Sequence, residues 1–377
     1  MAKKSKYVSL LKESVNNVPA YVPGKTTDQI ASECGLDKKT IIKLNSNENP
    51  LGPSKKVIKA IQEAAESASC YPSADAFDLR NALAKYTVFP IENIVVSGSG
   101  MDSIIDSLNK LFVESSDEVI LPVPTFTYYG ISAAALGGTP VYVNRNADFS
   151  ISADDILSKV TDRTKIIYLC SPNNPTGNVL DIADVQKLAE NSNAIIFIDE
   201  AYIEFSESGS LVSMIRDYEN IVVGRTFSKA FGLAGMRIGY AVAPKWIAEQ
   251  FLRITPPFSV SIISEIAAIA ALNDSKHLQK SIQTVQTERQ KLVKDILETT
   301  PYKTQPTESN FILVDVSPNT SKKAVATFLK YGIVVRSCDS FQNLGQSTIR
   351  ITVGTKKMNR YVLKAFEALK NEDVSQS

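Results

Sequence analysis

Histidine, cysteine and tryptophan are scarce in this chain of 377 residues, which has one, four and one of them respectively. The single histidine, His277, lies in a polar stretch typical of a helix start, so a Ser-His-Asp triad is not expected. Cys34, Cys70, Cys170 and Cys338 show no paired spacing, which argues against a zinc site, and we predict no metal. Any chemistry must therefore use lysine, arginine, aspartate or tyrosine side chains, or a borrowed cofactor.

Neither sign of charge dominates, and long apolar runs are absent. Lys+Arg 41 against Asp+Glu 40 leaves a net charge of +1, so no nucleic-acid surface is indicated. No run approaches the roughly 18 apolar residues of a membrane helix. The basic start of the chain is not followed by the apolar segment of a signal peptide. Because sparse cysteines suit a reducing compartment, we expect a cytoplasmic protein without a membrane or nucleic-acid partner.

The residues that are present suit a folded α/β protein, since 44% of them are hydrophobic. Between about Pro50 and Pro257, short apolar runs alternate with helical patterns. Nearly continuous apolar strands separated by helices indicate a mostly parallel central sheet that is buried on both faces. The predicted strands are residues 94–96, 119–121, 141–143, 166–170, 194–198, 221–223 and 238–243, with helices over 103–112 and 184–190.

The pattern changes after the pair Pro256-Pro257 and predicts a smaller α+β domain. Its expected elements are a long helix over 277–299, a helix over 322–331, and strands over 311–316, 333–335 and 349–353. The predicted division is residues 1–49 as an N-terminal arm and small-domain segment, 50–257 as the large domain, and 258–377 as the small C-terminal domain. The tail over 371–377 is expected to fray.

Polar clusters follow five of the predicted strands, at residues 97–102, 122–126, 171–177, 199–202 and 224–229. In an open α/β sheet, ligands bind beyond the carboxyl ends of the strands, so these clusters should meet in one crevice. Each has an ordinary explanation alone: a turn, a structural ion pair for Asp199, or a surface lysine for Lys229. Together they indicate a pyridoxal 5'-phosphate site, which needs a lysine for the aldehyde, an acid for the ring nitrogen and a helix N-terminus for the phosphate.

Several segments resemble the fold-type I aminotransferases of class I/II, and within this family the histidinol-phosphate aminotransferase branch. The resemblance extends from Tyr21 to Gly354, which is most of the chain. It implies a large domain with a mostly parallel sheet, a smaller α+β domain and pyridoxal phosphate as the cofactor. The segments that carry it are residues 44–53, 171–177, 199–205, 225–240 and 349–354.

Carried onto this sequence, the resemblance implies catalytic roles for Lys229, Asp199 and Tyr202. Lys229 matches the Schiff-base lysine that later shuttles a proton, and Asp199 matches the partner of the ring nitrogen. Asn174 and Tyr202 match the donors to the phenolic oxygen of the cofactor. Phe126 stands where an aromatic ring stacks on the cofactor; tyrosine is commoner there, and phenylalanine keeps the stacking face.

The resemblance also implies a phosphate site that two subunits share. The groups expected around the cofactor phosphate are the amides of Gly100, Met101 and Asp102, with Thr226, Ser228 and Arg237. Tyr71 matches a tyrosine that reaches the phosphate of the neighbouring subunit, which implies a homodimer. Cys70 stands where an arginine often precedes that tyrosine.

The substrate side is implied by two arginines of the small domain. Arg350 matches the residue that binds a substrate carboxylate, a task that suits the two-pronged guanidinium. Arg336 and Tyr21 match groups near the far end of the substrate, where a phosphate would lie, and the resemblance implies that Asn174 contacts the substrate as well. In isolation, Arg350 could equally be a strand arginine in a surface ion pair.

The implied reaction is a ping-pong transamination in which histidinol phosphate and 2-oxoglutarate give imidazole-acetol phosphate and glutamate, a step of histidine biosynthesis. Two alternative enzymes remain open: an aromatic amino acid aminotransferase and a threonine-phosphate decarboxylase. A pyridoxal-phosphate-binding domain of a transcription regulator would need a DNA-binding module, for which the chain leaves no room. A binding module without catalysis is disfavoured because Lys229 is present.

Overall fold

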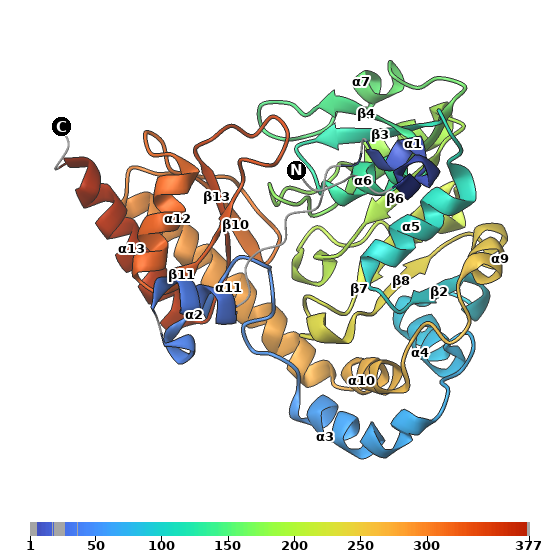
Figure 1. Cartoon of the computed structure of the whole chain (residues 1–377), viewed down its shortest axis with the longest axis horizontal. Helices are drawn as coiled ribbons and strands as arrows, with labels where there is room; N and C mark the ends of the chain where they lie inside the picture. The colour runs from blue at the N-terminus through green and yellow to red at the C-terminus, as the bar shows by residue number, and fades with distance from the viewer. Residues whose placement is uncertain (1–5, 17, 19–26, 36, 375–377) are drawn as a thin grey trace.

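The computed structural model describes residues 6–16, 18, 27–35 and 37–374. A seven-stranded sheet forms the centre of the larger part of the molecule, on the right in Figure 1. Strand β8 is antiparallel to both of its neighbours, and the other pairs are parallel. The strands in spatial order are β2 (Ile94–Ser97), β8 (Gly239–Val242), β7 (Ile221–Thr226), β6 (Ile195–Asp199), β5 (Thr164–Cys170), β3 (Glu118–Val123) and β4 (Thr139–Asn144).

Helices cover both faces of this sheet, as the uninterrupted apolar strands predict. Along β5, Tyr168 lies in the hydrophobic cluster of one face and Leu169 in that of the other. Helices α5 (Met101–Phe112), α6 (Tyr128–Ala135) and α9 (Lys245–Ile254) contribute to the first cluster. Helices α3 (Lys55–Ala64), α4 (Phe77–Thr87), α7 (Ala153–Leu157), α8 (Ile182–Asn191) and α10 (Ile262–Leu272) contribute to the second.

The smaller part, drawn in orange and red on the left of Figure 1, contains a four-stranded antiparallel sheet. Its strands in order are β12 (Arg336–Ser337), β13 (Thr348–Thr352), β10 (Phe311–Asp315) and β9 (Lys303–Thr304). Its helices are α11 (Ser275–Thr299), α12 (Ser321–Lys330) and α13 (Lys356–Val374). The α+β character predicted for this region is therefore present.

The N-terminal region contacts both parts. Helix α1 (Glu13–Asn16) lies on α6, where the Ser14 hydroxyl donates to the carbonyl oxygen of Ala135 at 3.1 Å. After α2 (Thr27–Cys34), strand β1 (Ile42–Lys43) pairs in parallel with β11 (Ile333–Val334). The strand predicted over 333–335 is present as β11, one residue shorter, and it is followed by the separate strand of Arg336 and Ser337, which pairs with β13.

The expectation of a frayed tail is wrong for residues 371–374, where α13 continues to Val374. The physical reason is Glu372, whose carboxylate pairs with Lys330 at 2.9 Å and accepts from Thr327 at 2.9 Å. These contacts attach the last turn of α13 to α12. Within the described part of the chain, no helix is long and apolar enough to cross a membrane.

The domain boundaries proposed above remain a prediction. Helix α10 follows the pair Pro256-Pro257, yet it packs on α3 and α4 of the larger part. The long helix α11 begins three residues after α10 and extends into the smaller part (Figure 1). The two parts meet where the carboxyl ends of β5, β6 and β7 face β12 and β13 across a cavity.

Candidate active site

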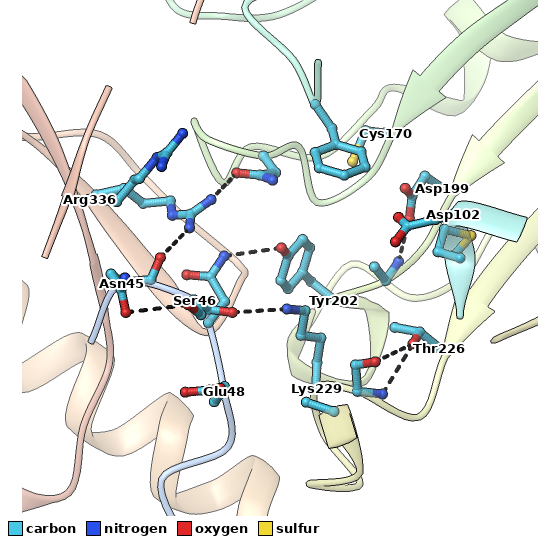
Figure 2. A pocket seen from close by; sticks show the side chains of 18 of the residues that line it. Asn45, Ser46, Glu48, Asp102, Cys170, Asp199, Tyr202, Thr226, Lys229 and Arg336 are labelled. Carbon is cyan, nitrogen blue, oxygen red and sulfur yellow. Dashed lines mark hydrogen bonds between the residues drawn. The ribbon is translucent and has the colours of Figure 1, made fainter. Parts of the chain in front are cut away.

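A cavity of about 480 Å³ lies between the carboxyl ends of the central strands and the smaller sheet. It brings together side chains from all five polar clusters predicted along the chain. The predicted site residues that line it are Met101, Asp102, Phe126, Asn174, Asp199, Tyr202, Thr226, Ser228, Lys229, Arg237, Arg336 and Arg350. Figure 2 shows Lys229 and Tyr202 between Arg336 on one side and Asp199 on the other.

Lys229 follows β7 and projects into the middle of this cavity. Its Nζ donates to the carbonyl oxygen of Ser46 at 3.1 Å (Figure 2). Burial lowers the pKa of the Lys229 amine to about 8, and the nearby Arg350 charge acts in the same direction. Near physiological pH the amine is therefore neutral more often than that of an ordinary lysine, and the neutral form is the one that attacks a carbonyl carbon.

Asp199 ends β6 and is 4% exposed. One carboxylate oxygen accepts from the Ala201 amide at 2.9 Å, and the other accepts from the Tyr129 hydroxyl at 2.7 Å. A structural ion pair is one prediction for Asp199 from the sequence, but no lysine or arginine among the described residues forms an ion pair with it. Because Asp199 is buried without such a partner, its pKa is raised to about 6. The cavity has room for a ligand whose positive charge would supply the missing cation.

Tyr129 is a site residue that sequence reasoning missed. It lies in the first turn of α6, directly after the predicted cluster 122–126, and is fully buried. Its ring stacks on Tyr168 with centroids 4.9 Å apart, and it meets the Phe126 ring edge-on at 5.4 Å. A tyrosine in the first turn of a helix that follows a polar cluster is the only sequence signal that could have indicated it.

The N-terminus of α5 forms an anion cradle at one end of the cavity. Gly100 precedes the helix with φ +74 and no side chain caps the first turn, so the first amides are available to a ligand. A Cβ atom at Gly239 would lie 2.4 Å from the carbonyl carbon of Gly100, so only glycine lets β8 pass this close. Arg237 donates to the Ser99 carbonyl at 3.0 Å and pairs with Asp102 at 3.2 Å.

The end of β7 supplies two hydroxyl groups beside this cradle. Thr226 Oγ1 donates to the carbonyl oxygen of Ile238 at 3.1 Å and accepts from the Ser228 amide at 3.1 Å. Both side chains are buried, at 3% and 7% exposure. These contacts hold the turn that carries Ser228 and Lys229 in one conformation.

The two predicted arginines are direct neighbours across the smaller sheet. Arg336 in β12 and Arg350 in β13 are paired in register. Arg350 is buried and donates to the Asn174 side chain and, at 2.8 Å, to the Asn45 carbonyl oxygen. Arg336 is half-buried and donates to the Ser340 hydroxyl at 3.4 Å. One end of the cavity thus presents two guanidinium groups, each able to bind a carboxylate or phosphate.

Two predicted site residues remain, Tyr71 and Tyr21, together with His277, for which the sequence predicts no catalytic role. Tyr71 does not line the cavity of its own chain; it is 84% exposed and its ring lies 5.0 Å from that of Phe258. Tyr21 lies outside the described residues. His277 Nε2 lies 3.0 Å from the Gly52 carbonyl oxygen and takes no part in a triad.

One wall of the cavity is formed by a segment for which the sequence predicts no function. The segment from Asn45 to Glu48 lines the cavity, although sequence analysis used it only as a point of resemblance. Asn47 donates to the Tyr202 hydroxyl oxygen at 3.0 Å, and Glu48 pairs with Lys43 at 2.9 Å. Its position follows from β1, which attaches the N-terminal chain to the smaller part.

The chain belongs to the class I and II aminotransferases, since the model of that family matches residues 39–366. It is 51% identical to the histidinol-phosphate aminotransferase of Methanosarcina mazei, over 96% of this chain and 97% of the relative. It is 50% identical to that of Methanosarcina barkeri, over 96% and 98% of the two chains. Among solved structures, it is similar to the histidinol-phosphate aminotransferase from Sinorhizobium meliloti in complex with pyridoxal-5'-phosphate. That match has a TM-score of 0.85 and 26% identity and covers 97% of this chain and 98% of the other. The resemblance noted in the sequence and the fold class predicted from it are thus confirmed.

Proposed function

We propose that this aminotransferase converts histidinol phosphate and 2-oxoglutarate to imidazole-acetol phosphate and glutamate, a step of histidine biosynthesis. The observation that carries the proposal is the pair Arg336 and Arg350, which are in register and share a cavity with Lys229. A nucleophilic amine beside two guanidinium groups suits substrates with anionic ends. The relatives named histidinol-phosphate aminotransferase supply the particular substrate.

The cofactor is pyridoxal 5'-phosphate, and the cavity fits it at three points. Lys229 offers an amine with a lowered pKa to the aldehyde. Asp199 is buried with neutral donors as its hydrogen-bond partners, which suits a cationic ring nitrogen. The uncapped start of α5 at Gly100 suits the phosphate. When bound, the cofactor supplies an electron sink for the carbon that carries the transferred amino group.

The residues of the chain then have separable tasks. Lys229 Nζ can accept a proton from the substrate carbon and return it, because its pKa of about 8 lies near the working pH. Phe126 offers a ring face on which an aromatic cofactor can stack. We assign Asn174 and Tyr202 as hydrogen-bond donors to the phenolic oxygen, since both line the cavity and are buried.

The two anionic substrates share one end of the cavity. Glutamate has an α-carboxylate, which we assign to Arg350, and a side-chain carboxylate, which we assign to Arg336. Histidinol phosphate lacks an α-carboxylate, so its phosphate would occupy the place near Arg336 and leave Arg350 with a smaller role. One site can thus serve both half-reactions of a ping-pong cycle.

We further infer a homodimer with shared active sites. The exposed pair Tyr71 and Phe258 presents two aromatic rings on the surface, which association of two copies would cover. Tyr71 would then reach the cofactor phosphate of the other subunit. Apart from this second subunit, the proposed partners are small-molecule substrates. A cytoplasmic location remains a prediction from the low cysteine content.

A substrate panel tests the proposed function against the alternatives. Glutamate formation from 2-oxoglutarate is measured with histidinol phosphate, phenylalanine or tyrosine as the amino donor, and carbon dioxide release is measured with threonine phosphate. The expected result is the highest kcat/KM for histidinol phosphate and no carbon dioxide. Turnover of phenylalanine without turnover of histidinol phosphate would establish an aromatic aminotransferase instead, and carbon dioxide release would establish a decarboxylase.

A further inference from the structure

The Tyr202 hydroxyl has a hydrogen-bond partner that comes from far along the chain. Asn47 Nδ2 donates to the Tyr202 oxygen at 3.0 Å, across a separation of 155 residues (Figure 2). Tyr202 is 5% exposed and Asn47 is 1% exposed, so this contact is shielded from bulk solvent. Burial raises the pKa of Tyr202 to about 12, so its hydroxyl is protonated at neutral pH.

The orientation of the Asn47 amide is determined by Thr352. The Thr352 hydroxyl oxygen accepts from the Asn47 backbone amide at 2.9 Å, and the same hydroxyl donates to Asn47 Oδ1 at 3.3 Å. Because the threonine proton needs an acceptor, Oδ1 faces Thr352 and Nδ2 faces Tyr202. Thr352 lies two residues after Arg350 in β13, so both side chains leave the strand on the same face.

The backbone of Asn47 is held equally firmly. Asn47 has φ +55, a left-handed conformation that asparagine tolerates better than most residues. Its carbonyl oxygen accepts from Asn310 Nδ2 at 3.0 Å, just before β10. Asn47 is therefore attached to β13 and to the residue just before β10, while its side chain reaches a residue of the larger part.

A hydroxyl that accepts from an amide on one side must direct its own proton elsewhere. The Tyr202 oxygen lies at the wall of the cavity, so the remaining direction for its proton is into the cavity. Donation from Asn47 also polarises the hydroxyl and makes it a stronger donor. We propose that Asn47 is a positioning residue that directs the Tyr202 proton toward the phenolic oxygen of the cofactor. This inference rests on the proposed function.

The test measures the pH midpoint of the visible colour change of the purified holoenzyme, which reports the charge state of the bound cofactor. Asn47→Gly keeps the left-handed backbone and removes the donor. Asn47→Asp keeps the shape, cannot donate, and would itself accept the Tyr202 proton. Because a hydrogen bond to an anionic oxygen favours the anion, each change should raise the midpoint, by about one pH unit for Asn47→Asp.

Two controls separate this effect from others. In a Tyr202→Phe background, Asn47→Gly should shift the midpoint no further, because the hydroxyl that it orients is gone. Asn45→Asp is the control for the charge that Asn47→Asp adds, because Asn45 lies on the same cavity wall without a contact to Tyr202. The midpoint shift that it causes should be equal with and without the Tyr202 hydroxyl. Thr352→Val should shift the midpoint in the same direction as Asn47→Gly, whereas Thr352→Ser keeps the hydroxyl and should leave the midpoint at its wild-type value. These two variants supply a second test if Asn47 variants fold poorly.

Equal shifts for Asn47→Gly with and without the Tyr202 hydroxyl would overturn the inference, as would an unchanged midpoint in the folded Asn47 variants. Both outcomes leave the proposed function intact, because the cofactor is still bound. A wild-type protein that takes up no pyridoxal phosphate and shows no visible band would instead overturn the proposed function itself and, with it, the role of Asn47.

Discussion

Tyr129 donates a 2.7 Å hydrogen bond to Asp199 from a ring that is stacked on Tyr168 at an interplanar angle of 8°. All three residues are buried, so the orientation of the carboxylate is set by packed aromatic rings and not by solvent. The second carboxylate oxygen is held by the Ala201 amide. Asp199 is thus oriented at both oxygens by groups that cannot neutralise its charge.

Tyr129→Phe should weaken binding of the cofactor about 10- to 150-fold, since a hydrogen bond to a charged group contributes about 1.5–3 kcal/mol. Loss of the donor raises the Asp199 pKa further, so less carboxylate is ionised where the ring nitrogen binds. The measurement is the cofactor Kd from a titration of apoprotein. Tyr168→Phe is the control because its hydroxyl bonds to Asn109 and not to Asp199, and equal losses in both variants would contradict the argument.

The central sheet could be predicted from the sequence because its strands are buried on both faces and read as apolar runs. The helix predicted over 103–112 begins earlier, at Met101, because Gly100 with φ +74 ends the preceding loop there. The two-residue strands β1, β9 and β12 were not predictable, since so short a pairing has no periodicity.

The candidate site was predictable where it follows strand ends, because parallel strands deliver their carboxyl ends to one crevice. Lys229 and Asp199 belong to this set. The contacts of Tyr129 with Asp199 and of Asn47 with Tyr202 span 70 and 155 residues, and they depend on how the layers pack. No local pattern encodes such contacts, so the structure was needed to find them.

Lys229 should be the residue that binds the cofactor covalently. The holoenzyme should be yellow, and reduction with borohydride followed by peptide mapping should place the label on the peptide that contains Lys229. The reason is that this amine opens into the cavity with its pKa lowered to about 8. Lys229→Ala should bind the cofactor without a borohydride-stable label, and a label on any other lysine would refute the assignment.

Arg350 and Arg336 should differ in which half-reaction they serve. Arg350→Ala should damage the glutamate half-reaction more than the histidinol-phosphate half-reaction, because only glutamate has an α-carboxylate. The loss of a bidentate, charge-assisted contact should cost about 2–4 kcal/mol, or roughly 30- to 1000-fold. Arg336→Ala should weaken both half-reactions, since each places an anion there.

Single-turnover spectra of the cofactor separate these half-reactions. Arg350→Lys is the matched variant, because it keeps the charge but not the two-pronged geometry, and its glutamate defect should be intermediate. Arg350 also bonds to Asn174 and Asn45, so some loss with both substrates is expected. Equal damage to the two half-reactions by Arg350→Ala would show that the division of tasks is wrong.

Tyr71 should act across a subunit interface. Tyr71→Ala and Lys229→Ala homodimers should both be impaired, while mixed dimers should regain about one functional site each. The regained site would combine the intact Tyr71 of one chain with the intact Lys229 of the other. Light scattering of the wild-type protein checks the oligomeric state, and a fully active monomer would refute the shared site.

Arg225 has one carboxylate as an ion-pair partner and a second carboxylate nearby, on the opposite face of the sheet from the cavity. Arg225 precedes Thr226 in β7, so its side chain points away from the cofactor side. It pairs with the fully buried Glu200 at 2.9 Å. Glu204 also lies near this charge, yet no other described residue hydrogen-bonds to either of its carboxylate oxygens. Burial raises the pKa of Glu204 to about 7.

Glu204 should therefore make the folded protein less stable as the pH rises. Between its ordinary pKa of 4.5 and about 7, folded Glu204 keeps a proton that the unfolded chain has released. Folding binds protons in this window, so the free energy of unfolding falls with increasing pH. Glu204→Gln stays neutral and should remove this contribution, gaining stability over wild type from about pH 5 to about pH 8 in urea denaturation of the holoenzyme.

Glu63→Gln is the control, because Glu63 is exposed and paired with Lys59 at the surface. Parallel stability curves for Glu204→Gln and wild type would show that Glu204 is already ionised in the folded protein.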